Sequence, residues 1–206
     1  MNSLFSRRFV AATLLASSTL LTGCAPLVIG GVAVGSMMVF SDRRTSGTQL
    51  EDQSIELKAS NRARDIVGDR GHVSATSYNR VVLLTGEVPS EAERAAVEKS
   101  IAQVENVKST VNELAVMGPT SMTARSNDTV LSSKVKATFV DAKDLQSNAF
   151  KVVTERGTVY LMGRVTEREG DRATELARSV AGVQRVVRVF EFLSEAELAA
   201  IGQQKK

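Results

Sequence analysis

The chain has 206 residues, which is enough for one medium domain or two small ones. Hydrophobic residues make up 43% and charged residues 24%, with only 3 prolines, so a packed core is expected and wholesale disorder is not. With 1 cysteine and 1 histidine, the composition excludes a Cys/His zinc site and a multi-disulfide scaffold. The formal net charge is +3, and it falls to +1 without Arg7 and Arg8 near the N-terminus, which argues against a general polyanion-binding protein.

Residues 1–23 have the features of an export signal. Two arginines precede an apolar run over residues 9–21, which is too short for a spanning helix of about 20 apolar residues. The run leads into Leu-Thr-Gly-Cys at residues 21–24, which resembles the lipobox of bacterial lipoproteins. That resemblance implies cleavage before Cys24 and attachment of acyl groups such as palmitate to it. A plain signal peptide and a buried cysteine are the alternatives.

The residues after Cys24 are interpreted as a tether. Several acyl chains together anchor a protein stably, and Ala25 in place of an aspartate implies the outer membrane by the same resemblance. Residues 25–41 are apolar, but they are short for a membrane span and their glycines oppose a helix. We therefore interpret residues 24–45 as a lipidated tether near the membrane surface, with a disordered linker as the alternative.

The rest of the chain repeats itself. When Gly86 is placed on Gly163, an offset of 77 residues, the segment VVLLTGEV at 81–88 aligns with TVYLMGRV at 158–165. The two glycines are expected where a strand gives way to a helix, because a residue without Cβ fits most readily there.

Each copy predicts the same elements in the same order. A helix opens it, with apolar residues at four-residue steps: Ile55, Ala59 and Ala63 in the first copy, and Leu131, Val135 and Phe139 in the second. A hairpin follows, and its second strand, the segment aligned above, is continuously apolar and so expected to be central and covered. A second helix begins after Pro89 or Thr166 with acidic residues in its first turn, and a strand over 107–114 or 183–193 closes the copy.

The order α-β-β-α-β, found twice, predicts an α+β fold in which both helices of each copy cover one face of a three-stranded mixed sheet. We expect copies at residues 46–118 and 126–194, packed independently and joined by a linker at 119–125 that contains Gly-Pro turn signals at its start. A tail at 195–206 with one short helix completes the prediction.

Several of these motifs together resemble a known family. The Val-x-Leu-x-Gly-x-Val signatures around Gly86 and Gly163, and the Gly-Val-x-x-Val step that begins at Gly182, are similar to those of BON domains. The layout of the whole mature chain resembles the dual-BON-domain outer-membrane lipoproteins. This implies a non-enzymatic protein, lipid-anchored and facing the periplasm, that binds anionic phospholipid through its second domain and supports envelope integrity. Outer-membrane or division-associated envelope proteins are candidate partners.

The two copies differ in charge. Residues 46–118 carry 8 basic and 11 acidic side chains, whereas residues 125–206 carry 14 and 11. An anionic membrane should repel the first copy and attract the second, since each basic group near such a surface contributes about 1 kcal/mol. Ordinary surface scatter is the alternative.

The opening helix of the second copy is the candidate lipid-binding element, with Asn127 or Asp128 expected as its N-cap. Its apolar stripe should pack on the sheet, and the remaining surface carries the candidate contact residues Val130, Ser133, Lys134, Lys136 and Ala137. A small apolar side chain can enter the headgroup boundary while lysines meet phosphates. Valine stands where members of this family can carry an aromatic, which predicts weaker binding, and an ordinary solvated face is the alternative.

The sequence predicts no catalytic residue, no metal site and no cofactor. His72 has no carboxylate or serine at a motif spacing, and Tyr78 and Tyr160 are interpreted as packing residues. Nucleic-acid binding is excluded by compartment and by a mature charge near zero. The leading function is a lipid-anchored membrane-binding module. A structural or adaptor lipoprotein that acts through envelope proteins is the alternative, and an exported hydrolase has the least support.

Overall fold

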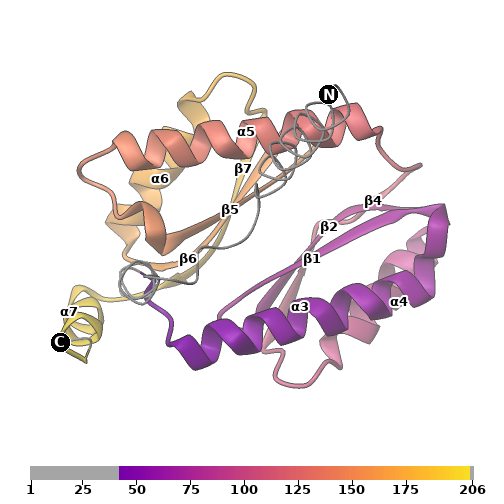
Figure 1. The fold of residues 1–206 in the computed structure, drawn as a ribbon, viewed down its shortest axis with the longest axis horizontal. Coiled ribbons are helices and arrows are strands. Elements are labelled where there is room, and N and C mark those ends of the chain that lie inside the picture. The colour runs from indigo at the N-terminus through magenta and orange to yellow at the C-terminus, as the bar shows by residue number, and fades with distance from the viewer. Residues whose placement is uncertain (1–41, 205–206) are drawn as a thin grey trace, which may run out of the picture. The chain divides into compact units, whose positions relative to one another are not determined.

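The computed structural model describes residues 42–204 (Figure 1). The described residues all belong to one compact unit. The export leader, the lipidation site at Cys24 and most of the tether lie outside them, so these remain predictions. No helix within residues 42–204 has the length and apolar character needed to cross a membrane.

The first repeat is a mixed sheet with two helices on one face. Its elements are α3 (Ser46–Val67), β1 (His72–Tyr78), β2 (Val81–Val88), α4 (Glu91–Ala102), β3 (Ser109–Asn112) and β4 (Ala115–Val116). β1 is antiparallel to β2, and β3 and β4 are both parallel to β2. The third strand, expected to be continuous over residues 107–114, is therefore shorter and interrupted, because the Asn112 side chain accepts a hydrogen bond from Leu114 N.

The second repeat has the same order. Its elements are α5 (Met122–Asp141), β5 (Phe150–Glu155), β6 (Thr158–Val165), α6 (Glu167–Ser179) and β7 (Arg185–Phe192), followed by α7 (Glu195–Gln204). β5 is antiparallel and β7 parallel to the central β6. The predicted α+β architecture, with helices on one face of a three-stranded mixed sheet, is confirmed in both repeats, with β3 and β4 together in the place of the third strand of the first sheet.

The start of α5 differs from the expectation. The prediction that Asn127 or Asp128 caps this helix is wrong, because the helix begins at Met122 and the Ser121 hydroxyl accepts a hydrogen bond from Ala124 N. Ser121 is thus the N-cap, within the range that the sequence assigned to the linker. Asp128 lies inside the helix and is buried, which leaves its carboxylate available to bind another part of the chain.

Both hairpins close with a two-residue turn held by an acid of the opening helix. The turn residues have positive φ and are Asn79, Arg80, Arg156 and Gly157. The carboxylate of Asp52 on α3 accepts hydrogen bonds from both backbone N–H groups of the first turn, at 2.8 Å. Asp128 on α5 does the same for the second turn, at 2.8 and 2.9 Å. The two acids lie 76 positions apart, so this contact repeats with the fold.

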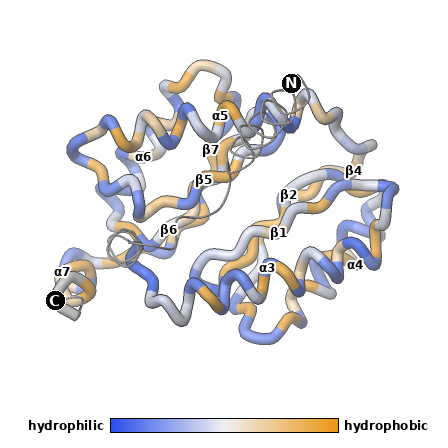
Figure 2. Tube along the Cα trace, in the orientation of Figure 1, coloured by the Kyte–Doolittle hydropathy of each residue, from blue (hydrophilic) through white to orange (hydrophobic). Residues whose placement is uncertain are grey.

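Each repeat has its own core between helices and sheet. Figure 2 shows hydrophobic and hydrophilic residues alternating along the helices, as expected for elements with one buried side. In β2, Val82 and Leu84 join the helix-facing core of the first repeat. Val159 and Leu161 of β6 do so in the second. The residues between them point to the opposite face of each sheet.

A third core joins the two repeats. Leu83 of β2 and its neighbour Tyr78 pack with Tyr160 and Met162 of β6, so the sheet faces turned away from the helices cover one another. This confirms that the continuously apolar strands are central and covered, and that both tyrosines are packing residues. It differs from the expectation of independent packing, because each repeat supplies half of the shared core.

Two consecutive arginines also join the repeats. Arg43 donates hydrogen bonds to both carboxylate oxygens of Glu169 on α6, at 2.6 and 2.8 Å, and both side chains are buried. Arg44 instead pairs with Asp52 of the first repeat at 2.6 Å and stacks on the Tyr78 ring at 4.1 Å. Arg43 therefore binds the second repeat, and its neighbour Arg44 binds the first.

The glycines that align between the repeats have a different role from the expected one. Gly86 and Gly163 lie inside β2 and β6 rather than at the junction between strand and helix. A Cβ would lie 2.0 Å from a backbone oxygen at Gly86 and 2.5 Å from one at Gly163, so close approach of the neighbouring strand requires glycine. Gly182 has a φ of 104°, which an L side chain rarely adopts.

Candidate functional site

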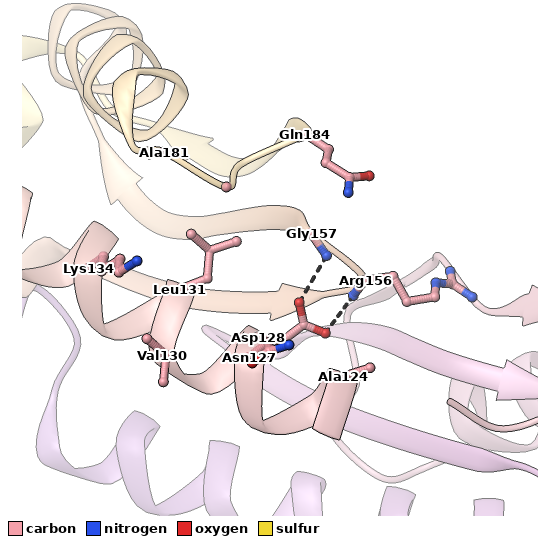
Figure 3. Close-up of a pocket in the computed structure, with 11 residues that line it drawn as sticks. Ala124, Asn127, Asp128, Val130, Leu131, Lys134, Arg156, Gly157, Ala181 and Gln184 are labelled. Atoms are coloured by element: carbon pink, nitrogen blue, oxygen red, sulfur yellow. Dashed lines mark hydrogen bonds between the residues drawn. The ribbon is translucent and has the colours of Figure 1, made fainter. Parts of the chain in front are cut away.

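A groove of about 390 Å³ lies beside α5 (Figure 3). One wall is the first half of α5, and the other comes from the β5–β6 turn and the connection between α6 and β7. Its lining includes Asn127, Val130, Leu131, Lys134, Arg156 and Gln184. The hydrogen bonds from the turn to Asp128, drawn in Figure 3, hold the turn against the helix and so fix the width of the groove.

The structure brings together two of the predicted contact residues. Val130 and Lys134 line the groove, and the Val130 side chain is 55% exposed. Ser133 and Ala137 lie on the exposed face of the helix outside the groove, and the Ser133 hydroxyl donates to Thr129 O. Lys136 lines a separate hollow further along the helix.

Several exposed apolar side chains belong to α5. Large hydrophobic residues with high exposure in the described part of the chain are Leu50, Leu57, Val116, Met117, Met122, Val130, Val140 and Phe192. Three of them, Met122, Val130 and Val140, belong to α5, and Val130 is the one that lines the groove.

The exposed lysines of α5 have no ion-pair partner in the part of the chain that the structure describes. Among the described residues, neither Lys134 nor Lys136 takes part in an ion pair, and Arg125 does not either. Basic residues elsewhere in the chain do form ion pairs, such as Lys58 with Glu105 in the first repeat and Arg164 with Glu191 in the second. The field at the exposed face of α5 is therefore positive.

Buried acids lie behind the groove. Glu87 of β2 is fully buried, and Glu155 at the end of β5 is nearly so. Burial, and then the nearby charges of Glu87 and Asp128, raise the pKa of Glu155 to about 7. At neutral pH this carboxyl is close to half protonated, which reduces the negative charge beneath the basic surface.

His72 lies at the start of β1, in a hollow that Ser60 and Ser74 also line. Burial, with a contribution from Arg125, holds the pKa of His72 below its ordinary value, so the imidazole is mainly neutral. No group of three or more potential metal ligands occurs among the residues that the structure describes. These observations agree with the interpretation of His72 as a structural residue.

Sequence reasoning missed the residues that the β5–β6 turn contributes. Neither Arg156 nor Gln184 carried a signal that marks it as a groove residue. The sequence offered one clue: Asp128 lies 76 positions after Asp52, one short of the 77-residue offset of the repeats, and an acid repeated inside two helices is a candidate for binding a turn.

The BON domain family matches residues 56–118 and 127–193, which together make up more than half of the chain. The chain is a BON-domain protein. Each match covers one of the two α-β-β-α-β repeats, so the resemblance found in the sequence motifs is confirmed.

Relatives extend the similarity beyond the BON domains. The chain is 37% identical to the outer membrane lipoprotein DolP of Haemophilus influenzae over 185 residues, which cover 88% of this chain and 95% of that protein. It is 28% identical to the 21 kDa hemolysin of Actinobacillus pleuropneumoniae, covering 74% and 79%. It is 29% identical to osmotically-inducible protein Y of Escherichia coli, covering 72% and 76%. The chain is non-enzymatic, as predicted, in keeping with its two BON domains and its similarity to an outer membrane lipoprotein.

Proposed function

We propose that this chain is an outer-membrane lipoprotein, anchored through acyl groups on Cys24 and facing the periplasm, whose second BON domain binds anionic phospholipid. Its role is to support the integrity of the envelope. The observation that carries the proposal is the exposed face of α5, where Val130 lies beside lysines that no described acid neutralises. Similarity to an outer membrane lipoprotein over 88% of the chain supports the location.

The face combines the two interactions that bilayer interfaces offer. Lys134 at the groove and Lys136 further round are positioned on either side of Val130, Ser133 and Ala137, which are all exposed. Lysines with long flexible stems can reach lipid phosphates while an apolar centre enters the headgroup boundary. The charge difference between the two repeats favours the same orientation, with the second repeat toward the membrane.

Binding through this face alone should be weak. Burying Val130 contributes about 1–2 kcal/mol, and each lysine near an anionic surface contributes about 1 kcal/mol. The sum corresponds to a dissociation constant in the range of about 1 mM. A flexible tether raises the local concentration of a linked site to about the millimolar range, so an anchor at Cys24 would make this affinity sufficient.

The test is co-sedimentation of residues 42–206 with vesicles. This segment contains all three cores and lacks the anchor, so it reports binding by the folded part alone. Binding should increase with the fraction of phosphatidylglycerol in phosphatidylcholine vesicles and decrease with salt. Lys134→Glu and Val130→Asp should each reduce it severalfold.

Two matched controls make the result specific. Lys99→Glu makes the same charge change on an exposed residue of α4 and should have little effect. Val140→Asp places the same charge on exposed α5 surface outside the groove and should have less effect than Val130→Asp. Equal binding to neutral vesicles, or indifference to Lys134→Glu, would contradict the proposal. The adaptor function, with envelope proteins as partners, would then be the better account.

A further inference from the structure

Arg156 connects the groove of the second repeat with the first repeat. Its backbone lines the groove, but in Figure 3 its side chain extends away from Lys134. The Arg156 Nη1 atom lies 3.2 Å from Met117 Sδ and 3.7 Å from Glu87 Oε1. The guanidinium is thus directed toward the linker and toward β2 of the other repeat.

Glu87 is the acid that pairs with this guanidinium, and Glu155 also lies within Coulombic range of it. Its side chain is fully buried, and in the described part of the chain Arg156 is its ion-pair partner. The N–H and the hydroxyl of Thr120 also donate to the Glu87 carboxylate, at 3.2 Å. At 3.7 Å, the pair with Arg156 is longer than the 2.7–2.9 Å of a charge-assisted hydrogen bond, so the attraction is Coulombic and lacks a fixed geometry.

We propose that Glu87 restrains Arg156 outside the groove, and that a lipid phosphate in the groove competes for the same guanidinium. An acid of the first BON domain then sets the affinity of the lipid site on the second. This inference rests on the proposed function and adds a regulating residue to it.

The exchange is favourable for three reasons. A phosphate can accept two parallel hydrogen bonds from a guanidinium, which Glu87 does not do here. The Met117 thioether is only a weak acceptor, so its loss costs little. Glu87 keeps both donors of Thr120 when Arg156 leaves, which offsets part of the cost of leaving a buried carboxylate without its cation.

The backbone allows this movement without unfolding. Arg156 N and Gly157 N remain bound to Asp128, so the turn stays fixed while the side chain rotates. The Arg156 side chain is 28% exposed, which leaves it room to change rotamer. Its long flexible stem gives the guanidinium the reach to turn toward the groove that its own backbone lines.

The test compares three variants of residues 42–206 in binding to phosphatidylglycerol vesicles. Glu87→Gln removes the charge, keeps the shape and retains an acceptor for Thr120. It should strengthen binding by about three- to tenfold, as expected for release of one partly exposed ion pair. Arg156→Gln should weaken binding. The double variant should bind like Arg156→Gln, because the gain depends on the freed arginine.

A purely structural role for Glu87 predicts a different pattern. Glu87→Gln would then weaken binding, or would change it equally with and without Arg156, and either result overturns the inference. If the wild-type chain itself does not prefer anionic vesicles, the proposed function has failed. If wild type binds and Lys134→Glu weakens it while the folded Glu87→Gln variant is unchanged, only this inference has failed.

A second measurement covers the case in which Glu87→Gln does not fold. The Arg156 Nε–H resonance of the wild-type chain should shift when short-chain phosphatidylglycerol is added, together with the carboxyl carbon of Glu87. Inorganic phosphate without lipid should produce a smaller shift, which separates a headgroup from a free anion. A change at Lys134 without a change at Arg156 or Glu87 would contradict the competition.

Discussion

Replacing Arg43 with alanine should weaken the joint between the two BON domains. The guanidinium binds both oxygens of Glu169 at 2.6 and 2.8 Å and also donates to Arg164 O at 2.8 Å. Removing one partner of a buried ion pair costs about 3–5 kcal/mol, because the other charge is left unpaired. Glu169 still accepts a hydrogen bond from Thr166 N at the start of α6, where the helix dipole favours an acid. We therefore expect a loss of about 2–4 kcal/mol in the free energy of unfolding.

Urea unfolding of residues 42–206 measures this loss, with Arg64→Ala as the control. Arg64 is an exposed arginine of α3, and its replacement should change stability by less than about 0.5 kcal/mol. A loss for Arg43→Ala of under about 1 kcal/mol, or no larger than the control, would refute the reasoning.

The pH dependence gives a second check on the same pair. Burial opposes ionisation of Glu169, but hydrogen bonds from Arg43 and Thr166 N hold its pKa below the ordinary value of 4.5. The stability that this acid contributes is complete above pH 4.5 and is lost as the pH falls through the lowered value. The difference in the free energy of unfolding between wild type and Arg43→Ala should therefore become smaller as the pH falls below 4.5.

Three further predictions concern residues of the second repeat that lie in or beside its central sheet. Met162→Asp would bury an unpaired charge in the shared core, so urea unfolding should show a loss of about 3–5 kcal/mol, and hydrogen exchange should show weaker protection in both repeats. Glu155, whose pKa is about 7, stabilises the fold when protonated and loses that contribution as the pH rises from 4.5 through 7. Glu155→Gln should thus increase the free energy of unfolding by about 1–2 kcal/mol at about pH 8, after solvent screening, and have little effect at about pH 5. Thermal unfolding at the two pH values should show this as a higher melting temperature at about pH 8 only. Gly163→Ala should cost about 1–3 kcal/mol in thermal unfolding, since its Cβ would lie 2.5 Å from Ala149 O, and a neutral result would contradict the close approach.

The element order could be predicted because the chain carries it twice, once in the local patterns of each repeat. Four-residue steps in the opening helices and an uninterrupted apolar strand are signals that do not depend on the rest of the fold. The same strand also indicated coverage on both faces, but not what covers the second face. The second face is covered by a contact between distant segments, in which Tyr160 and Met162 pack on Tyr78 and Leu83. No local pattern in the sequence predicts this contact.

The groove beside α5 was predicted only in part, because local patterns predict which helix residues are exposed but not which distant residues lie beside them. The exposure of Val130 and Lys134 follows from helical periodicity, and the structure agrees on both. Asp128 was misread because an Asx residue before an apolar run is the usual signature of an N-cap, whereas the true cap, Ser121, follows a Gly-Pro turn signal. Arg156 joins the groove only through the fold, since it lies 28 positions from the helix residue that binds its N–H.

The face-to-face packing of the sheets makes this chain resemble a dimer whose subunits have been fused. Each repeat covers a surface that a single copy would leave open to water, and the covering surface comes from a near copy of the same unit. A second repeat released from the first would expose Tyr160 and Met162 together on one flat face. Such a fragment has an apolar surface that a second copy of itself can match, so separation of the halves should yield self-association in place of two stable monomers.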